Sequence, residues 1–159
     1  MRNRIQLMQS LAQRGFSIVE AMVALLVLSI GMLGVAGLYV TTLRASGSAL
    51  YRTHAVNLAA DMADRIRSNP DAGLAYAGAG ANNNCVGGAV DCNPATLAAD
   101  DIFTWRREIG TILPDDGNAG TPQGTITIVD GNPRTYTIRL FWMEPTEPQA
   151  LSYTLIMQI

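Results

Sequence analysis

The longest hydrophobic segment of the chain lies near its amino end and leads into a segment with a different pattern. Residues 21–43 are all uncharged and mostly apolar. Between Arg44 and Ser68 there is no Pro, and apolar side chains recur at helical spacing. This stripe consists of Ala55, Leu58, Ala59, Met62, Ala63 and Ile66. Because the residue before a Pro disfavours helical geometry, Asn69-Pro70 should end the segment. The pattern predicts one helix over residues 17–68, about 78 Å long.

The uncharged run is long enough to cross a membrane. Residues 21–43 would form a helix of about 34 Å, and the hydrocarbon core of a bilayer is about 30 Å thick. Arg2, Arg4 and Arg14 precede the run, whereas only Arg44 and Arg52 follow it closely. This asymmetry favours a cytoplasmic amino end. We therefore predict a membrane-spanning first half of the helix and an exported remainder.

The rest of the chain predicts a short helix and an antiparallel sheet. Asn93-Pro94 is typical of a helix start, and the helical pattern continues to Pro114. Alternating apolar and polar residues predict three strands, over residues 125–129, 134–143 and 151–159. Residues 71–93, rich in Gly, Ala and Asn, are predicted to be a loop. The predicted fold class is α+β, a long amino-terminal helix packed on a small antiparallel sheet with one short extra helix.

Two features of this part have a structural and a functional interpretation. Trp105 is either a partner contact or a residue packed on the sheet, and we favour packing. Asp115-Asp116-Gly117-Asn118 suggests a calcium loop, but it lacks the alternating acids and closing Glu of an EF-hand. We interpret it as a polar turn.

Composition and charge narrow the function classes. The 159 residues suffice for one small domain plus an appendage. The formal net charge is −2, from 11 basic residues that are all Arg and 13 acidic residues, so nucleic-acid binding is not expected. The chain has one His, His54, and no set of residues typical of nucleophilic catalysis or of a phosphate loop. We expect no enzyme activity, no catalytic residue and no cofactor.

The two cysteines, Cys85 and Cys92, lie in the predicted loop. In an exported domain a pair of cysteines favours an intrachain disulfide. A zinc site is the alternative, but with His54 as the only His the four usual ligands are lacking. We therefore predict a Cys85–Cys92 disulfide and no metal site.

A single acid stands directly before the uncharged run. Glu20 would carry its charge into a membrane helix, where such a group costs upward of about 2.5 kcal/mol. An acid at this position is by default a functional residue. The alternative is that Glu20 only complements the positive end of the helix dipole.

The segment Gly15-Phe16-Ser17-Ile18-Val19-Glu20, with a basic leader before it and the apolar run after it, resembles the class III signal of type IV pilins and type II secretion pseudopilins. An ordinary secretory signal has its apolar region before the cleavage site. The resemblance implies that a prepilin peptidase cuts between Gly15 and Phe16 and methylates the new amino terminus at Phe16. It also implies that Glu20 is the acid at the fifth mature position, which serves assembly.

The signal divides the chain into three predicted parts. Residues 1–15 would be the leader peptide, residues 16–43 the transmembrane and assembly half of the long helix, and residues 44–159 a periplasmic globular domain. Gly31, Gly34 and Gly37 recur within the second part. They favour either close helix–helix packing or local melting of the helix when the subunit enters a filament.

Residues 58–70, with the later Trp105 and Leu113-Pro114, resemble the PilV family of minor pilins, the type IV pilus modification proteins. This implies a subunit of a tip complex that primes pilus assembly and modulates adhesion. The chain has no Lys, which excludes pilus types joined through lysine isopeptide bonds, so we expect its contacts with other subunits to be non-covalent. Its partners would be other minor pilins and the major pilin. The protein would lie in the inner membrane as a single-pass protein before assembly, and then in the pilus at the cell surface. The alternative is a pseudopilin of a type II secretion system.

Overall fold

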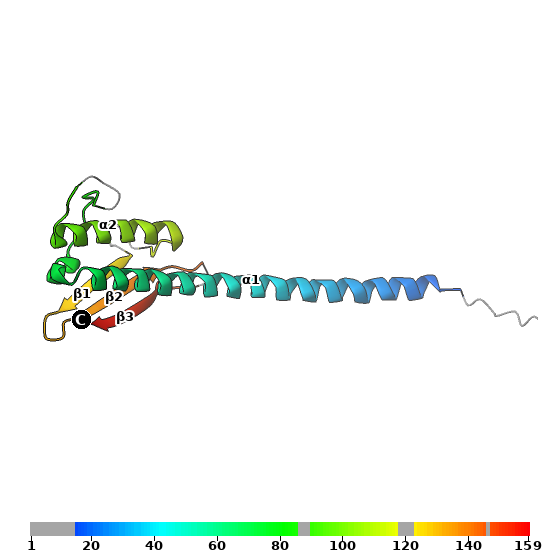
Figure 1. The fold of residues 1–159 in the computed structure, drawn as a ribbon. Coiled ribbons are helices and arrows are strands. Elements are labelled where there is room, and N and C mark those ends of the chain that lie inside the picture. Colours follow the sequence, from blue (N-terminus) through cyan, green and yellow to red (C-terminus); the bar gives the residue numbers. More distant parts are fainter. Residues whose placement is uncertain (1–14, 86–89, 118–122, 146) are drawn as a thin grey trace, which may run out of the picture. The chain divides into compact units, whose positions relative to one another are not determined.

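The computed structural model describes residues 15–85, 90–117, 123–145 and 147–159. Its elements, in chain order, are the helix α1 (Ile18–Ser68), the 3-10 segment η1 (Pro70–Ala77), the helix α2 (Pro94–Ile112) and the strands β1 (Gly124–Val129), β2 (Thr135–Trp142) and β3 (Leu151–Gln158) (Figure 1). The chain divides into two compact units after Arg44. Helix α1 contributes residues to both units. The predicted α+β fold, with one long helix, three strands and one short extra helix, is confirmed.

Local sequence signals set the helix ends. Helix α1 begins at Ile18, one residue after the predicted start, and the carbonyl of Ser17 accepts a hydrogen bond from the Ala21 amide at 3.1 Å. Pro70 excludes any continuation beyond Ser68. At the start of α2 the side chain of Asn93 accepts a hydrogen bond from the Thr96 amide at 2.9 Å, an N-cap that satisfies one of the free donors of the first turn.

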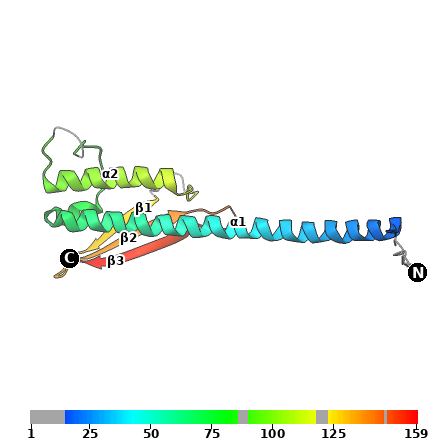
Figure 2. The same ribbon diagram turned by 45° about the vertical axis from the view of Figure 1, so that its right-hand side comes forward.

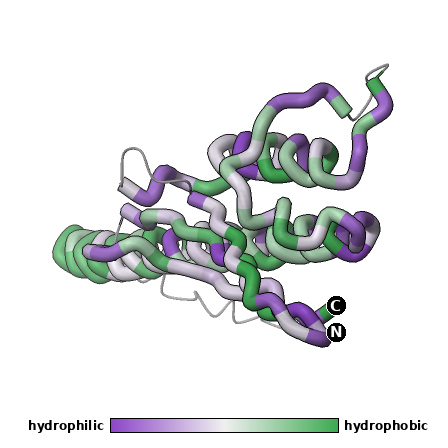
Figure 3. The backbone as a smooth tube through the Cα atoms, turned by 90° about the vertical axis from the view of Figure 1, so that its left-hand side faces the viewer, coloured by the Kyte–Doolittle hydropathy of each residue, from purple (hydrophilic) through white to green (hydrophobic). Residues whose placement is uncertain are grey.

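In the first unit, α1 has no cover over its apolar side chains. Its hydrophobic residues between Phe16 and Leu43 are about half to four-fifths exposed, and Figure 3 colours this run green to white. The hydroxyls of Ser29 and Thr41 donate to the carbonyls of Leu26 and Leu38 at 2.8 Å. The helix therefore satisfies these polar groups internally, as a hydrocarbon environment requires. It is the one helix in the described chain that is long and apolar enough to cross a membrane.

The second unit has a helical layer on one face of a three-stranded antiparallel sheet (Figure 2). The strand order is β1-β2-β3, and Ile138 of β2 lies opposite Ile126 of β1 and Leu155 of β3. β1 and β2 are joined by a turn that contains a cis Asn132–Pro133 peptide bond. Since neighbouring residues of a strand face opposite sides, alternate residues of β2 enter the core, and these are Tyr136, Ile138, Leu140 and Trp142.

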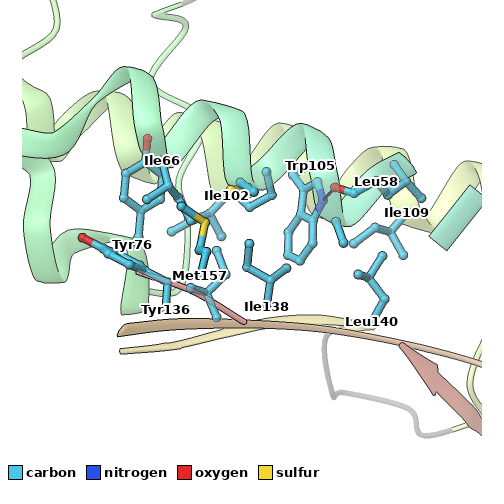
Figure 4. Packing of buried hydrophobic residues seen from close by; sticks show 14 of the residues in the cluster. Leu58, Ile66, Tyr76, Ile102, Trp105, Ile109, Tyr136, Ile138, Leu140 and Met157 are labelled. Atoms are coloured by element: carbon cyan, nitrogen blue, oxygen red, sulfur yellow. Dashed lines mark hydrogen bonds between the residues drawn. The ribbon is translucent and has the colours of Figure 1, made fainter. Parts of the chain in front are cut away.

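The core lies between the sheet and the helical layer. The stripe predicted on α1 is buried in full, from Ala55 to Ile66. Figure 4 shows Trp105 of α2 between α1 and the sheet, with its indole Nε1 donating to the Leu58 carbonyl at 2.8 Å. A Cβ added at Gly124 of β1 would lie 2.5 Å from the Trp105 ring. Trp105 is therefore a fully buried packing residue, as favoured from the sequence.

The prediction of a loop over residues 71–93 is wrong in its first part. Pro70–Ala77 forms η1, which is interrupted at Gly73, where φ is +53°. Tyr76 lies in η1 and is 1% exposed. Two buried groups hold the segment, the aromatic ring of Tyr76 and the side chain of Asn69, so tertiary contacts give it a structure that its own composition does not indicate.

Candidate processing and assembly site

The predicted cleavage bond lies at an exposed, non-helical start of α1. Gly15, Phe16 and Ser17 precede the helix without regular structure. Phe16 is 78% exposed, and apart from the chain neighbours of Gly15 no described residue lies within 4 Å of a Cβ built on Gly15. A peptidase needs an accessible backbone at the bond that it cuts, and residues 15–17 are exposed and lie outside the helix. The leader residues 1–14 lie outside the described residues.

Glu20 lies in the first turn of α1 and is exposed. A negative charge there is favourable for the helix dipole. Phe16 is four residues earlier in the chain, so an amine at Phe16 would lie at the same end of the helix as the Glu20 carboxylate. In the uncleaved chain the nitrogen of Phe16 is part of a peptide bond and carries no charge, so an ion pair between Phe16 and Glu20 would require cleavage.

A second cluster of polar groups joins α1, η1 and α2. The Tyr76 hydroxyl donates to Oδ2 of Asp101 at 2.8 Å and lies 3.2 Å from the Arg65 carbonyl. Arg65 forms an ion pair with Asp61 at 2.8 Å and a longer one with Asp101 at 3.3 Å. Burial, and then the hydrogen bond to Asp101, raise the pKa of Tyr76 above its ordinary range. Asn69 completes the cluster by donating to the Pro94 carbonyl at 2.9 Å.

The same cluster sets the charge of Arg65. Burial alone would lower the pKa of Arg65, but its hydrogen bonds and charge attraction to Asp61 and Asp101 outweigh burial and raise the pKa. Arg65 therefore stays protonated and compensates the buried carboxylate of Asp101. The cluster is a structural connection between elements, because its charges are paired and its polar atoms are hydrogen-bonded.

The segment after η1 is held on α2 by separate contacts. Oδ1 of Asp100 accepts hydrogen bonds from the amides of Asn83 at 2.6 Å and Asn84 at 2.9 Å. Arg106 donates to the carbonyls of Ala79 and Gly124, and burial lowers the pKa of its guanidinium. The segment is thus fixed by a carboxylate and a guanidinium of the same helix.

A disulfide joins Cys85 and Cys92 at the far end of this segment. The sulfur of Cys85 also lies 3.8 Å from the Thr96 carbonyl oxygen in the first turn of α2. Residues 86–89, between the two cysteines, are outside the described part of the chain.

Comparison with known families places these features in context. Residues 11–36 match the family described as the prokaryotic N-terminal methylation motif. Residues 37–103 match the Tt1218-like family, described as type IV pilin Tt1218. The two matches adjoin and together run from the leader to the middle of α2. The chain therefore contains a type IV pilin domain preceded by an N-terminal methylation motif. Neither the curated proteins nor the solved structures include a match to this pilin.

The methylation motif covers the residues that the sequence assigned to processing and assembly. Gly15, Phe16 and Glu20 of the pilin all lie within residues 11–36. Such a motif implies processing by a prepilin peptidase and assembly with other pilins. The pilin-family match covers the stripe of α1, the cluster around Tyr76 and the disulfide, and it ends at Phe103, so the three strands lie beyond it.

Metal binding has no candidate site in the described parts of the pilin. No group of three or more His, Cys, Asp or Glu residues there could hold a metal ion. Of the predicted turn at residues 115–118, the structure describes the first three residues, and the Gly117 amide donates to the Asp115 side chain at 2.8 Å. This hydrogen bond is typical of a polar turn.

Sequence reasoning missed the buried polar cluster of the pilin. Asp100 and Asp101 of α2 are both more than nine-tenths buried and accept hydrogen bonds from other parts of the chain. The spacing of α2 contained a signal, since Asp101, Trp105 and Ile109 recur every four residues and therefore share a face.

Proposed function

We propose that this pilin is a minor pilin of a type IV pilus, of the PilV family, and a non-covalent subunit of the tip complex. In that role it primes pilus assembly with other minor pilins and the major pilin, and modulates adhesion. One observation carries the proposal. The residues that resemble that family, from Leu58 to Pro70 with Trp105, hold α1, η1 and α2 together through the Trp105–Leu58 bond and the Tyr76 cluster.

Before assembly the protein is a single-pass protein of the inner membrane with a cytoplasmic amino end. Residues 1–15 are the leader, residues 16–43 the membrane and assembly segment, and residues 44–159 the periplasmic domain. The uncovered apolar side chains of α1 and the arginines before them support this orientation. After assembly the protein lies in the pilus at the cell surface.

Cleavage supplies the counter-charge for Glu20. A prepilin peptidase cuts between Gly15 and Phe16, and the new amine of Phe16, once methylated, still carries a positive charge. Within a bundle of apolar helices an unpaired carboxylate is costly, and pairing it with an amine offsets that cost. Glu20 pairs with a Phe16 amine, its own or that of an adjacent subunit. Only the cleaved protein has this amine, so only the cleaved protein can compensate Glu20 inside the filament.

Replacing Glu20 by Leu or Ala tests this role. We expect cleavage and methylation to continue, because the bond after Gly15 is exposed and non-helical. We expect at least a tenfold drop in the amount of the variant in sheared pili, since an unpaired amine costs about 2.5 kcal/mol and about 1.4 kcal/mol is a factor of ten. Ser29→Ala, in the same apolar run, is the control. Undiminished incorporation of Glu20→Leu would contradict the pairing.

Mass spectrometry of the protein from its native host tests the processing step itself. The expected amino-terminal peptide begins at Phe16 and carries one methyl group. A mature protein that still contains residues 1–15 would refute the assignment as a pilus subunit.

Deletion of the gene tests the proposed place of the protein. We expect loss of surface pili, and a wild-type protein present in sheared pili at a small fraction of the major pilin. Pseudopilins of type II secretion systems share the same signal. A deletion that leaves surface pili intact and abolishes release of secreted proteins would assign the protein to a secretion system instead.

A further inference from the structure

The sheet of the second unit is incompletely covered at β3. On the face that packs against the helices, the residues of β2 are buried, whereas Leu151, Tyr153 and Leu155 of β3 are only partly buried. Val56 of α1, next to the start of this strand, is 42% exposed. The described residues do not cover these neighbouring apolar side chains. A contiguous exposed apolar patch is typical of an interaction surface.

Val56, Leu151 and Tyr153 border a groove between α1 and the first half of β3. Its volume is about 310 Å³. It is lined by Arg52, Val56, Trp142, Leu151, Ser152 and Tyr153. The volume is enough for one or two side chains of a partner, but far too small for a packed helix.

The backbone of β3 offers unpaired hydrogen-bonding groups beside the groove. Ile159 exchanges two backbone hydrogen bonds with Arg134 of the neighbouring chain segment. In an antiparallel pair such residues alternate with residues whose groups point away from the partner strand. The amides and carbonyls of Ser152, Thr154, Ile156 and Gln158 are therefore directed to the outer edge. β3 is the last strand in the sheet order, and in Figures 1 and 2 it lies at the edge of the sheet.

Nothing in the sequence of β3 protects this edge. Charges and prolines commonly block pairing at an edge strand, and residues 149–159 contain neither Asp, Glu, Lys, Arg nor Pro. The groove has a single charge, that of Arg52. Arg52 is exposed and has no ion pair or hydrogen bond with any of the residues that the structure describes.

We propose that the edge of β3 and this groove accept an extended segment of another pilin subunit, which adds to the sheet as a fourth strand and places a carboxylate against Arg52. The outward amides and carbonyls of β3 can be satisfied by the backbone of another strand. The partly exposed apolar residues of the groove would be covered by an apolar side chain on that strand, and the guanidinium of Arg52 would be paired with one of its acids. This is β-strand addition, in which backbone hydrogen bonds supply affinity and side-chain pockets supply specificity. The inference rests on the proposed function and names the surface through which this pilin contacts a neighbour.

Site-specific photo-crosslinking in cells that assemble the pilus tests this surface. A photoreactive amino acid replaces Ser152 in the full-length protein, and the crosslinked peptide is identified by mass spectrometry. We expect a peptide from a non-helical segment of another pilin, with Asp or Glu within a few residues of the crosslink. The same probe at Thr111 on α2 is the control, and we expect little crosslinking there.

Two variants then test the charge and the backbone. Arg52→Glu should lower the Ser152 crosslink by about fivefold or more, since it replaces attraction by repulsion, whereas Arg107→Glu on α2 should leave it unchanged. Thr154→Pro removes one outward amide without touching the hydrogen bonds to β2, and it should lower the crosslink as well. Folding of each variant is checked by the fluorescence of its buried tryptophans. If Thr154→Pro does not fold, Arg52→Glu alone tests the surface.

The outcomes separate this inference from the proposed function. If the protein is present in sheared pili but Ser152 crosslinks no more than Thr111, or crosslinks to a helix or to its own chain, the β3 surface is refuted and the minor-pilin assignment stands. An Arg52→Glu variant with an unchanged crosslink also refutes it. If the protein is absent from pili, both proposals fail.

Discussion

Replacing Tyr76 by Phe removes one oxygen atom from the buried contact between η1 and α2. The hydroxyl has a single proton, and it donates to the carboxylate of Asp101 at 2.8 Å. The aromatic ring, 1% exposed, keeps its packing in the variant. A hydrogen bond to a charged group contributes about 1.5–3 kcal/mol, so we expect the free energy of unfolding to fall by about 2 kcal/mol. Arg65 still pairs with Asp101, which keeps the loss from being larger.

The two tryptophans make this measurable in the full-length protein. Trp105 and Trp142 are the only tryptophans in the chain, and both are buried in the second unit. Their fluorescence during denaturant unfolding in detergent micelles therefore reports the second unit alone. Tyr136→Phe is the matched control, because the partners of the Tyr136 hydroxyl are the Gly73 carbonyl, at the long distance of 3.5 Å, and the Arg134 side chain, not a carboxylate. We expect that control to lose less than about 1 kcal/mol.

The pH dependence gives a second, independent readout. Burial and the bond to Asp101 raise the pKa of Tyr76 above its unfolded value of 10.0. The folded protein then holds the phenol proton more tightly than the unfolded chain. The stabilisation is fully present below pH 10 and is lost as the pH rises from there toward the folded pKa. Tyr76→Phe should remove this part of the alkaline loss of stability.

A Tyr76→Phe variant within about 0.5 kcal/mol of the wild type, well below the expected charged hydrogen bond, would refute the account. The account would also be refuted if the Tyr76→Phe variant lost as much stability above pH 10 as the wild type does. Either result would mean that the Tyr76–Asp101 bond contributes no net stability and that Arg65 alone compensates Asp101.

Two further predictions concern packing and the disulfide. Gly124→Ala places a Cβ 2.5 Å from the Trp105 ring and should cost about 1–3 kcal/mol in denaturant unfolding, whereas Gly110→Ala, with no atom closer than 3.9 Å, should be neutral or gain up to about 1 kcal/mol. Replacing Cys85 and Cys92 by Ser should cost at most about 2.5 kcal/mol on the loop-entropy model. In this variant the backbone amides of Asn83 and Asn84, which donate to Asp100 of α2, should stay protected from hydrogen exchange. If they lose their protection, the disulfide alone holds the segment on α2.

Local signals explain which elements could be predicted from the sequence. Pro70 and the Asn93 cap act on their immediate neighbours, so the end of α1 and the start of α2 agree with the sequence to the residue. The strands alternate strictly and their bounds agree within one or two residues. The processing residues from Gly15 to Glu20 are likewise a local pattern, which the methylation-motif match covers.

Tertiary contacts explain what could not be predicted. η1 is a short Gly- and Ala-rich segment with no periodicity, and it is structured because Tyr76 reaches Asp101, 25 residues later in the chain. The burial of Asp101 depends on that same contact. The groove at β3 requires α1 to lie beside a strand about 100 residues away, and no local pattern indicates which side chains of that strand stay uncovered.

Helix α1 supplies both the uncovered apolar run and the stripe buried under the sheet. A pull on a filament held by the first half would therefore be transmitted along one run of backbone hydrogen bonds directly into the folded core. The described backbone between these two stretches is helical throughout. Resistance to tension then depends on how slowly the sheet separates from residues 55–66, which makes the unfolding rate, more than the equilibrium stability, the property under mechanical selection.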